Sequence, residues 1–261
     1  MPIDLVPYLS FATAVFRYVD TGNYTYNELS NEINIETGGM GFSTQARSAS
    51  GDKGGYLSSF DIKVKALYGK LDEAFRIIEE ILFTSKLDDY TRLKEIIGEI
   101  KSQVKMELSA SGHITAANRA LSYFSKGAAF KEATEGIAFY EFIEDIDRHF
   151  EDKKESLVKG MKESLAEALR KGNLTISYTG DNDISVYQDS IDHFIRKLST
   201  RPEHDIRKPW ELSKKNEGCK TASKVQDVAT ACNFVNGCYE YNGSMKVLQI
   251  IFSYDYLWQQ V

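Results

Sequence analysis

Thr37-Gly-Gly-Met-Gly-Phe-Ser-Thr44 marks the point at which the hydrophobic pattern of this chain changes from a helical period to an alternating one. Large and small side chains alternate from Met40 to Ala46, as they do in a half-buried strand. Gly51-Asp-Lys-Gly-Gly55 has the composition of a hairpin turn, and a second alternating run follows from Tyr56 to Leu67. Residues 37–67 therefore predict two antiparallel strands.

Helical periodicity dominates on both sides of this strand pair. Apolar residues recur at helical spacing in eight segments, Asp4–Val19, Asn27–Glu36, Leu71–Phe83, Asp88–Ser109, Ile114–Ser125, Ala133–Asp147, Glu151–Lys171 and Ile184–Leu198. A short run rich in β-forming residues, Leu174–Gly180, separates the last two. The order predicts a helix-rich α+β fold, with helices packed on one face of an antiparallel sheet.

A linker is predicted at residues 200–210, which hold two of the four prolines and show no apolar period. Lys224–Phe234 and Lys246–Ser253 beyond it are expected to be strands. We therefore divide the chain into a domain at residues 1–199 and the opening of a second such domain at 211–261. Tyr254–Trp258 is typical of the first turns of a helix but has no stop signal, so we expect the chain to be part of a longer one.

Composition excludes several classes of function. A formal charge of −6 and a pI near 5.4 argue against a nucleic-acid surface, and no apolar run approaches the roughly 18 residues that span a bilayer. Three cysteines, Cys219, Cys232 and Cys238, argue against a disulfide framework and favour a reducing compartment. We expect a soluble, cytoplasmic protein with no nucleic-acid or membrane partner.

Three motifs in order along the chain carry a family resemblance. They are Pro7-Tyr-Leu-Ser-Phe11 leading through Asp20–Leu29 to Thr37–Thr44, then Ser111-Gly-His-Ile-Thr-Ala-Ala117, and finally the run from Met245 to Trp258. Together they resemble the presequence-protease-like branch of the pitrilysin/insulinase superfamily of zinc peptidases, in the region after the catalytic half. The resemblance implies a pitrilysin-type α+β domain and zinc in the parent enzyme.

The chemistry of that superfamily requires His-x-x-Glu-His on a helix, because this spacing puts two zinc ligands and a general base on one face. None of the four histidines of this chain lies in such a motif. By resemblance, Asp4–Val19 occupies the place of the zinc helix, but Tyr8–Phe16 within it contains no side chain that binds a metal. We expect no catalytic residue, no metal ligand and no cofactor in this chain.

Two positions are candidates for binding. By resemblance, Gly39, Met40, Gly41, Phe42, Ser43 and Thr44 form a strand that lines the closed substrate chamber of the parent; the alternative is a helix stop followed by an ordinary hairpin strand. His113 lies at a helix break and is a candidate polar contact to a peptide or another domain. Its alternative is that Ser111 caps the helix and His113 only occupies the first turn.

The resulting hypothesis is a non-catalytic half-domain of a zinc-dependent endopeptidase that degrades unstructured peptides. This chain would form chamber wall and inter-domain contacts, so its partners would be the remaining domains of the same polypeptide and the peptide substrates. An open sheet edge would also allow dimerisation. The alternative is a stand-alone, degenerate scaffold or peptide-binding subunit without catalysis.

Overall fold

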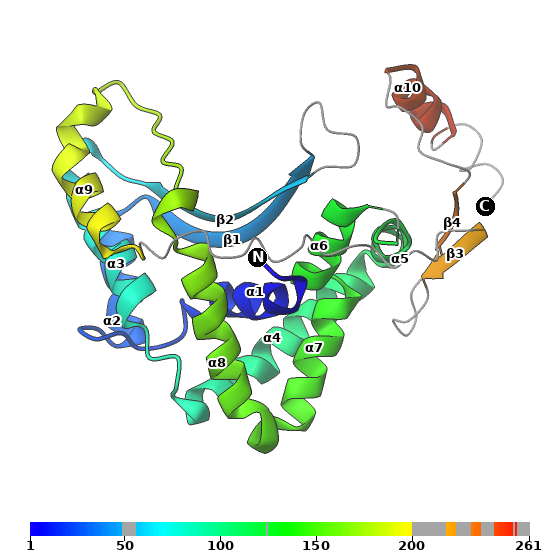
Figure 1. Cartoon of the computed structure of the whole chain (residues 1–261), viewed down its shortest axis with the longest axis horizontal. Coiled ribbons are helices and arrows are strands. Elements are labelled where there is room, and N and C mark those ends of the chain that lie inside the picture. The colour runs from blue at the N-terminus through cyan, green and yellow to red at the C-terminus, as the bar shows by residue number, and fades with distance from the viewer. Residues whose placement is uncertain are drawn as a thin grey trace.

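The computed structural model describes residues 1–48, 56–123, 125–199, 218–222, 231–235, 243–252 and 254. The helices are α1 (Val6–Val15), α2 (Tyr26–Glu36), α3 (Leu71–Thr84), α4 (Tyr90–Ala110), α5 (Gly112–Leu121), α6 (Lys126–Glu135), α7 (Ile137–Arg148), α8 (Phe150–Ala168), α9 (Gln188–Lys197) and α10 (Gly243–Ile251). The strands are β1 (Gly39–Ser48), β2 (Tyr56–Lys65), β3 (Gly218–Ala222) and β4 (Ala231–Val235). The described part is therefore helix-rich and carries two small antiparallel sheets (Figure 1).

The predicted strand pair is confirmed. β1 and β2 are antiparallel in a register that runs from Gly39 opposite Lys65 to Ser48 opposite Tyr56. One face of this pair carries apolar side chains that join the core, namely Met40, Phe42, Phe60, Ile62 and Val64. Side chains alternate between the faces of a strand, so the other face presents the intervening, mainly polar residues.

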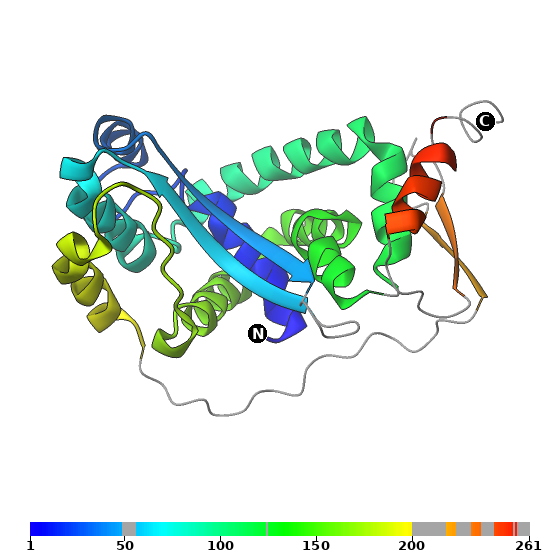
Figure 2. The ribbon, with the colours of Figure 1, turned by 90° about the horizontal axis from the view of Figure 1, so that it is seen from above.

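The core lies below the strand pair and is centred on α1, which contacts β1, α6 and α8 (Figures 1 and 2). Phe11, Ala12, Val15 and Phe16 are all at most 1% exposed. Phe16 reaches the sheet, where its ring centroid lies 5.3 Å from that of Phe42. The helices thus pack on the apolar face of the strand pair, in agreement with the α+β prediction, although the finer pitrilysin-type assignment stays a prediction.

Local signals explain most helix boundaries. α2 begins with a capping box in which Thr25 accepts from the backbone N–H of Glu28 and Glu28 accepts from that of Thr25. Asp89 caps α4 by accepting a hydrogen bond from the N–H of Arg92, as its position in the sequence predicts. These caps satisfy backbone donors that a helix start leaves without partners.

The predicted helix at Ala133–Asp147 is wrong, because the segment is divided between α6 and α7. Gly136 interrupts it with an extended backbone, at φ −92° and ψ −162°. A Cβ atom at Gly136 would lie 2.3 Å from Oε2 of Glu132, which explains why glycine occupies the break. Helical periodicity continued across this point in the sequence and concealed it.

Two expected strands are also absent where the sequence placed them. Leu174–Gly180, all of it described, has no strand pairing in the structure. Most of Lys246–Ser253 belongs to helix α10, and only Ser253 lies outside the described residues. Apolar residues at Val247, Leu248, Ile250 and Ile251 fit a helical face as well as a buried strand, and a short apolar run does not distinguish the two.

Other predictions fall wholly or partly outside the described residues. The turn at Gly51–Gly55, the linker at 200–210 and nearly all of Tyr254–Trp258 are among them. Ala231–Val235, at the end of the predicted strand Lys224–Phe234, is strand β4 and pairs with β3. The division into domains at 1–199 and 211–261 stays a prediction.

Candidate functional site

The turn that leads into β1 fixes the start of the candidate chamber strand. Thr37 ends α2 by donating its hydroxyl to the carbonyl oxygen of Ile33 at 2.7 Å, and the hydroxyl oxygen accepts from the N–H of Gly39 at 3.2 Å. The N–H of Gly38 donates to the carbonyl oxygen of Lys65 at 2.7 Å. Gly39 adopts φ +130°, a conformation that side chains disfavour. The Thr-Gly-Gly sequence therefore sets the register of β1 against β2.

The six candidate residues of β1 divide between the two faces of the strand. Met40 is 7% exposed and Phe42 packs between Phe16 and Phe60, so both face the helical core. By alternation, Thr44 shares their face, and Gly39, Gly41 and Ser43 lie on the opposite one. A Cβ atom at Gly39 or Gly41 would meet nothing within 4 Å, so the backbone is open on that side. The face away from the helices is thus the part of the strand that an approaching chain can reach.

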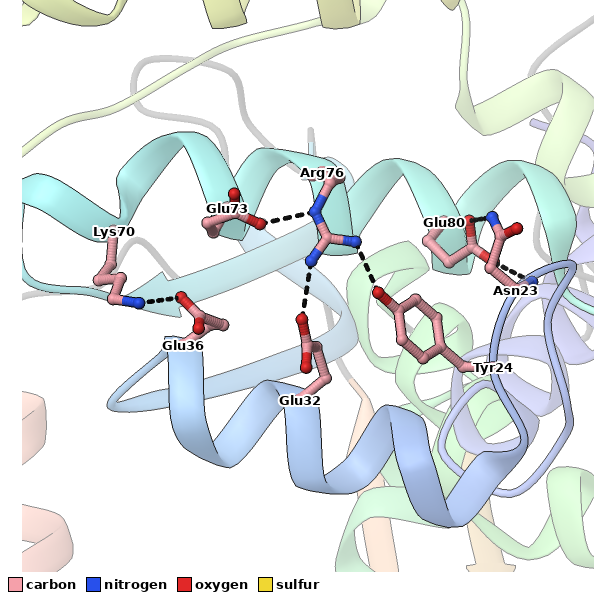
Figure 3. A network of polar contacts seen from close by, with 8 residues as sticks. All are labelled: Asn23, Tyr24, Glu32, Glu36, Lys70, Glu73, Arg76 and Glu80. Atoms are coloured by element: carbon pink, nitrogen blue, oxygen red, sulfur yellow. Dashed lines mark hydrogen bonds and ion pairs between the residues drawn. The ribbon is translucent and has the colours of Figure 1, made fainter.

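A polar network joins α2 and the turn before it to α3 (Figure 3). Arg76 of α3 lies at its centre and donates to Glu73 at 2.6 Å, to Glu32 at 2.8 Å and to the hydroxyl of Tyr24 at 2.9 Å. Lys70 forms an ion pair with Glu36 at 2.7 Å, at the end of α2. We define the polar seam by its members, Asn23, Tyr24, Glu32, Glu36, Lys70, Glu73, Arg76 and Glu80.

Glu80 holds the other end of the polar seam. Its carboxylate accepts hydrogen bonds from the backbone N–H of Asn23 at 2.8 Å and from the side-chain amide of Asn23 at 2.9 Å. Burial of Glu80 alone would raise its pKa, but hydrogen bonds from Thr21, Asn23 and Thr84 outweigh burial and lower the pKa to about 2. The carboxylate is therefore ionised at neutral pH and holds the turn before α2 in place.

The polar seam positions β1 indirectly. It attaches the start of α2 through Asn23 and Tyr24 and the end of α2 through Glu36, one residue before Thr37. Sequence reasoning missed these residues as a group, because Asn23 and Glu80 are 57 positions apart and Glu32 and Arg76 are 44 apart. The local signal that the sequence did offer was the Thr25 and Glu28 spacing of the capping box.

His113 lies where the sequence placed it, in the first turn of α5, and its side chain is exposed. The expectation that Ser111 caps this helix is wrong, since Ser111 makes no side-chain cap hydrogen bond. Thr115 bridges the break instead by donating to the carbonyl oxygen of Leu108 at 3.0 Å. His113 does not lie beside the candidate residues of β1 in sequence or in the main contacts of α5, which involve α4, α6, β3 and β4.

The described residues of this chain do not supply a zinc site. Helix α1 is fully described and reads Val-Pro-Tyr-Leu-Ser-Phe-Ala-Thr-Ala-Val, so it offers no imidazole, thiolate or carboxylate. Across the described ranges, no group of three or more His, Cys, Asp or Glu side chains is arranged to hold a metal. Nor does any described helix have the length and apolar character needed to cross a bilayer.

The described residues form an α+β domain whose first helix is filled with apolar side chains, the arrangement expected of a non-catalytic peptidase region. Residues 1–146 match the family described as peptidase-associated, of peptidase family M16 subfamily C, and the chain belongs to this family. The resemblance to a non-catalytic region of the presequence-protease-like branch of the pitrilysin/insulinase superfamily is thereby confirmed.

Individual relatives agree with this assignment. The chain is 32% identical to Protein HypA of Clostridium perfringens over 262 residues, which cover 100% of this chain and 27% of the relative. It is 22% identical to Presequence protease 1, chloroplastic/mitochondrial, of Arabidopsis thaliana, covering 99% of this chain and 24% of that protein. Presequence protease, mitochondrial, of Drosophila melanogaster is 28% identical over 51% of this chain and 13% of its own length. The chain spans about a quarter of the length of the first two relatives.

Proposed function

We propose that this chain is a non-catalytic half-domain of a zinc-dependent endopeptidase that degrades unstructured peptides in a closed chamber. The observation that carries the proposal is the family match of residues 1–146, together with alignments to presequence proteases. In this proposal zinc and the general base belong to another part of the parent polypeptide. The chain contributes chamber wall and contacts with the remaining domains.

The β1 face supports the wall role. Gly39, Gly41 and Ser43 present an open backbone on the side of the strand away from the helical core, and the polar seam holds the helix that leads into this strand. An extended peptide that lies along such a face meets little steric hindrance. Met40 and Phe42 support the wall from behind, because their side chains belong to the core.

The purified chain tests the catalytic half of the proposal. We expect no stoichiometric zinc by elemental analysis and no cleavage of a quenched-fluorescence peptide. Zinc at one ion per chain, or hydrolysis that a chelator abolishes, would overturn the assignment.

Sequencing the gene on both sides of residues 1–261 tests the rest. We expect His-x-x-Glu-His upstream. A start codon at Met1 and a stop codon after Val261 would instead favour a scaffold or peptide-binding subunit.

A surface test distinguishes wall from scaffold in the parent enzyme. Gly41→Trp places a large side chain on the open face, and we expect it to raise KM for long peptides more than for short ones. Ser58→Trp on β2 is the matched control, because Ser58 is exposed and pairs with Ala46 near the far end of the strands. Equal effects of the two substitutions would contradict the wall role of β1.

A further inference from the structure

Helix α5 has apolar side chains on two opposite faces. Its inner face packs against the helices before and after it through buried Thr115, Ala116 and Ala120. On its other face Ile114 is 51% exposed and Leu121 is 44% exposed, with exposed Ala117 between them. We call Ile114, Ala117 and Leu121 the α5 stripe. A helix that is apolar on both faces is normally covered on both faces.

The inner attachment of α5 is firm, so the α5 stripe is held in a fixed direction. Arg119 donates to Glu132 of α6 at 2.8 Å, and Glu132 is only 5% exposed. The same Glu132 oxygen accepts from the backbone N–H of Ala138 in α7. α5 cannot rotate to bury the α5 stripe against α6 without breaking this buried ion pair, which is costly.

Contacts beside the α5 stripe indicate what covers it. Both strands of the β3–β4 pair contact α5, and this pair comes from the part of the chain beyond residue 199 (Figure 1). The following helix, α10, begins eight positions after Val235, within about 30 Å of chain reach. α10 also carries uncovered apolar residues, Val247, Leu248, Ile250 and Ile251. Two apolar surfaces on one chain therefore lie within reach of each other.

We propose that the α5 stripe is the docking site for the downstream section of this same chain, made of β3, β4 and α10. The two strands already contact α5, and α10 adds apolar surface that completes the cover. His113 stands next to Ile114 and lies at the rim of this interface. The inference rests on the inter-domain role proposed above, but its test does not use peptide hydrolysis, so the two can fail separately.

Hydrogen exchange on the full chain, read by mass spectrometry, tests the docking. Leu121→Glu and Ile114→Glu put a charge into the proposed interface, and we expect amides in 218–235 and 243–252 to exchange at least several-fold faster. Ile35→Glu is the matched control, because Ile35 is 70% exposed on α2, outside the α5 stripe. It should leave exchange in both segments unchanged. Equal exchange in the wild type and both stripe variants would overturn the proposal.

A cross-link on the otherwise natural chain gives an independent readout. Ala117→Cys places a thiol on the α5 stripe, and the chain already carries Cys219 in β3 and Cys232 in β4. A short bismaleimide should join the new thiol to one of them within a single chain, whereas Ile35→Cys should give no such link. Links only between two chains, with a matching dimer in light scattering, would show that a second copy occupies the stripe and would also overturn the proposal.

Discussion

Two helix pairs of this chain are held together by opposite means. α1 and α8 meet through apolar surfaces, where Gly160 of α8 receives the ring of Tyr8 and Leu157 and Met161 are fully buried. α2 and α3 meet through the polar seam, whose central Arg76 is half exposed. The first pair depends on shape, because close packing leaves no room for added atoms, and the second depends on the direction of hydrogen bonds. The same fold therefore responds to side-chain volume in one place and to charge and pH in the other.

The largest expected effect lies on the shape-dependent side. Phe16→Ala removes a ring that is 1% exposed and packs between α1 and the sheet. We expect the free energy of unfolding to fall by about 3–5 kcal/mol, since a large cavity remains. Phe83→Ala is the control, because Phe83 is 40% exposed and its loss should cost far less. Urea titration followed by circular dichroism measures both, and equal losses would contradict a core centred on α1.

Gly160→Ala tests the close approach of α8 to α1. The new Cβ atom would lie 2.4 Å from Cδ1 of Tyr8, so we expect a loss of about 1–3 kcal/mol from overpacking. Gly98→Ala makes the same change inside α4, where a Cβ atom meets nothing within 4 Å. It should stabilise the protein by about 0.5–1 kcal/mol through helix propensity. Thermal unfolding should therefore shift in opposite directions, and a shared direction would refute the shape argument.

Glu80→Gln tests the polar seam by charge. At neutral pH we expect a loss of about 1–2 kcal/mol, because hydrogen bonds to a charged acceptor become hydrogen bonds to a neutral one. The pKa of Glu80 is lowered in the folded state from 4.5 to about 2, so its contribution is present above pH 4.5 and is lost as the pH falls towards 2. The difference in stability between wild type and variant should shrink over that range. Glu141→Gln at an exposed position should show no such pH dependence.

The sequence predicted the parts of the fold that follow from local period and local caps. The strand pair, the Asp89 cap and the break before Gly112 were all correct. Leu174–Gly180 has strand-forming residues, but no pairing partner is formed for it among the described residues, and partners are not encoded locally. The run in α10 is too short for its apolar spacing to distinguish helix from strand.

The candidate site was predictable to the same extent. Alternation along residues 39–44 separates the core-facing Met40 and Phe42 from the open Gly41, and this follows from the sequence alone once the strand is accepted. The polar seam was not predictable, because its pairs connect residues tens of positions apart and both partners resemble ordinary surface charges. Only the packing of α2 on α3 brings them together.

The smallest expected effect comes from Arg76→Met, which keeps most of the side-chain volume and removes the donors at the centre of the polar seam. Arg76 is 43% exposed, and its ion pairs are screened by water, so we expect a loss of about 0.5–1 kcal/mol that narrows at high salt. Arg148→Met should cost less, because Arg148 is 68% exposed and lies 3.8 Å from Glu144. Hydrogen exchange of the β1 amides distinguishes stability from positioning. If the seam positions β1, Arg76→Met should speed exchange at residues 39–44 more than the small stability change explains, and unchanged exchange there would leave the seam as a simple surface contact.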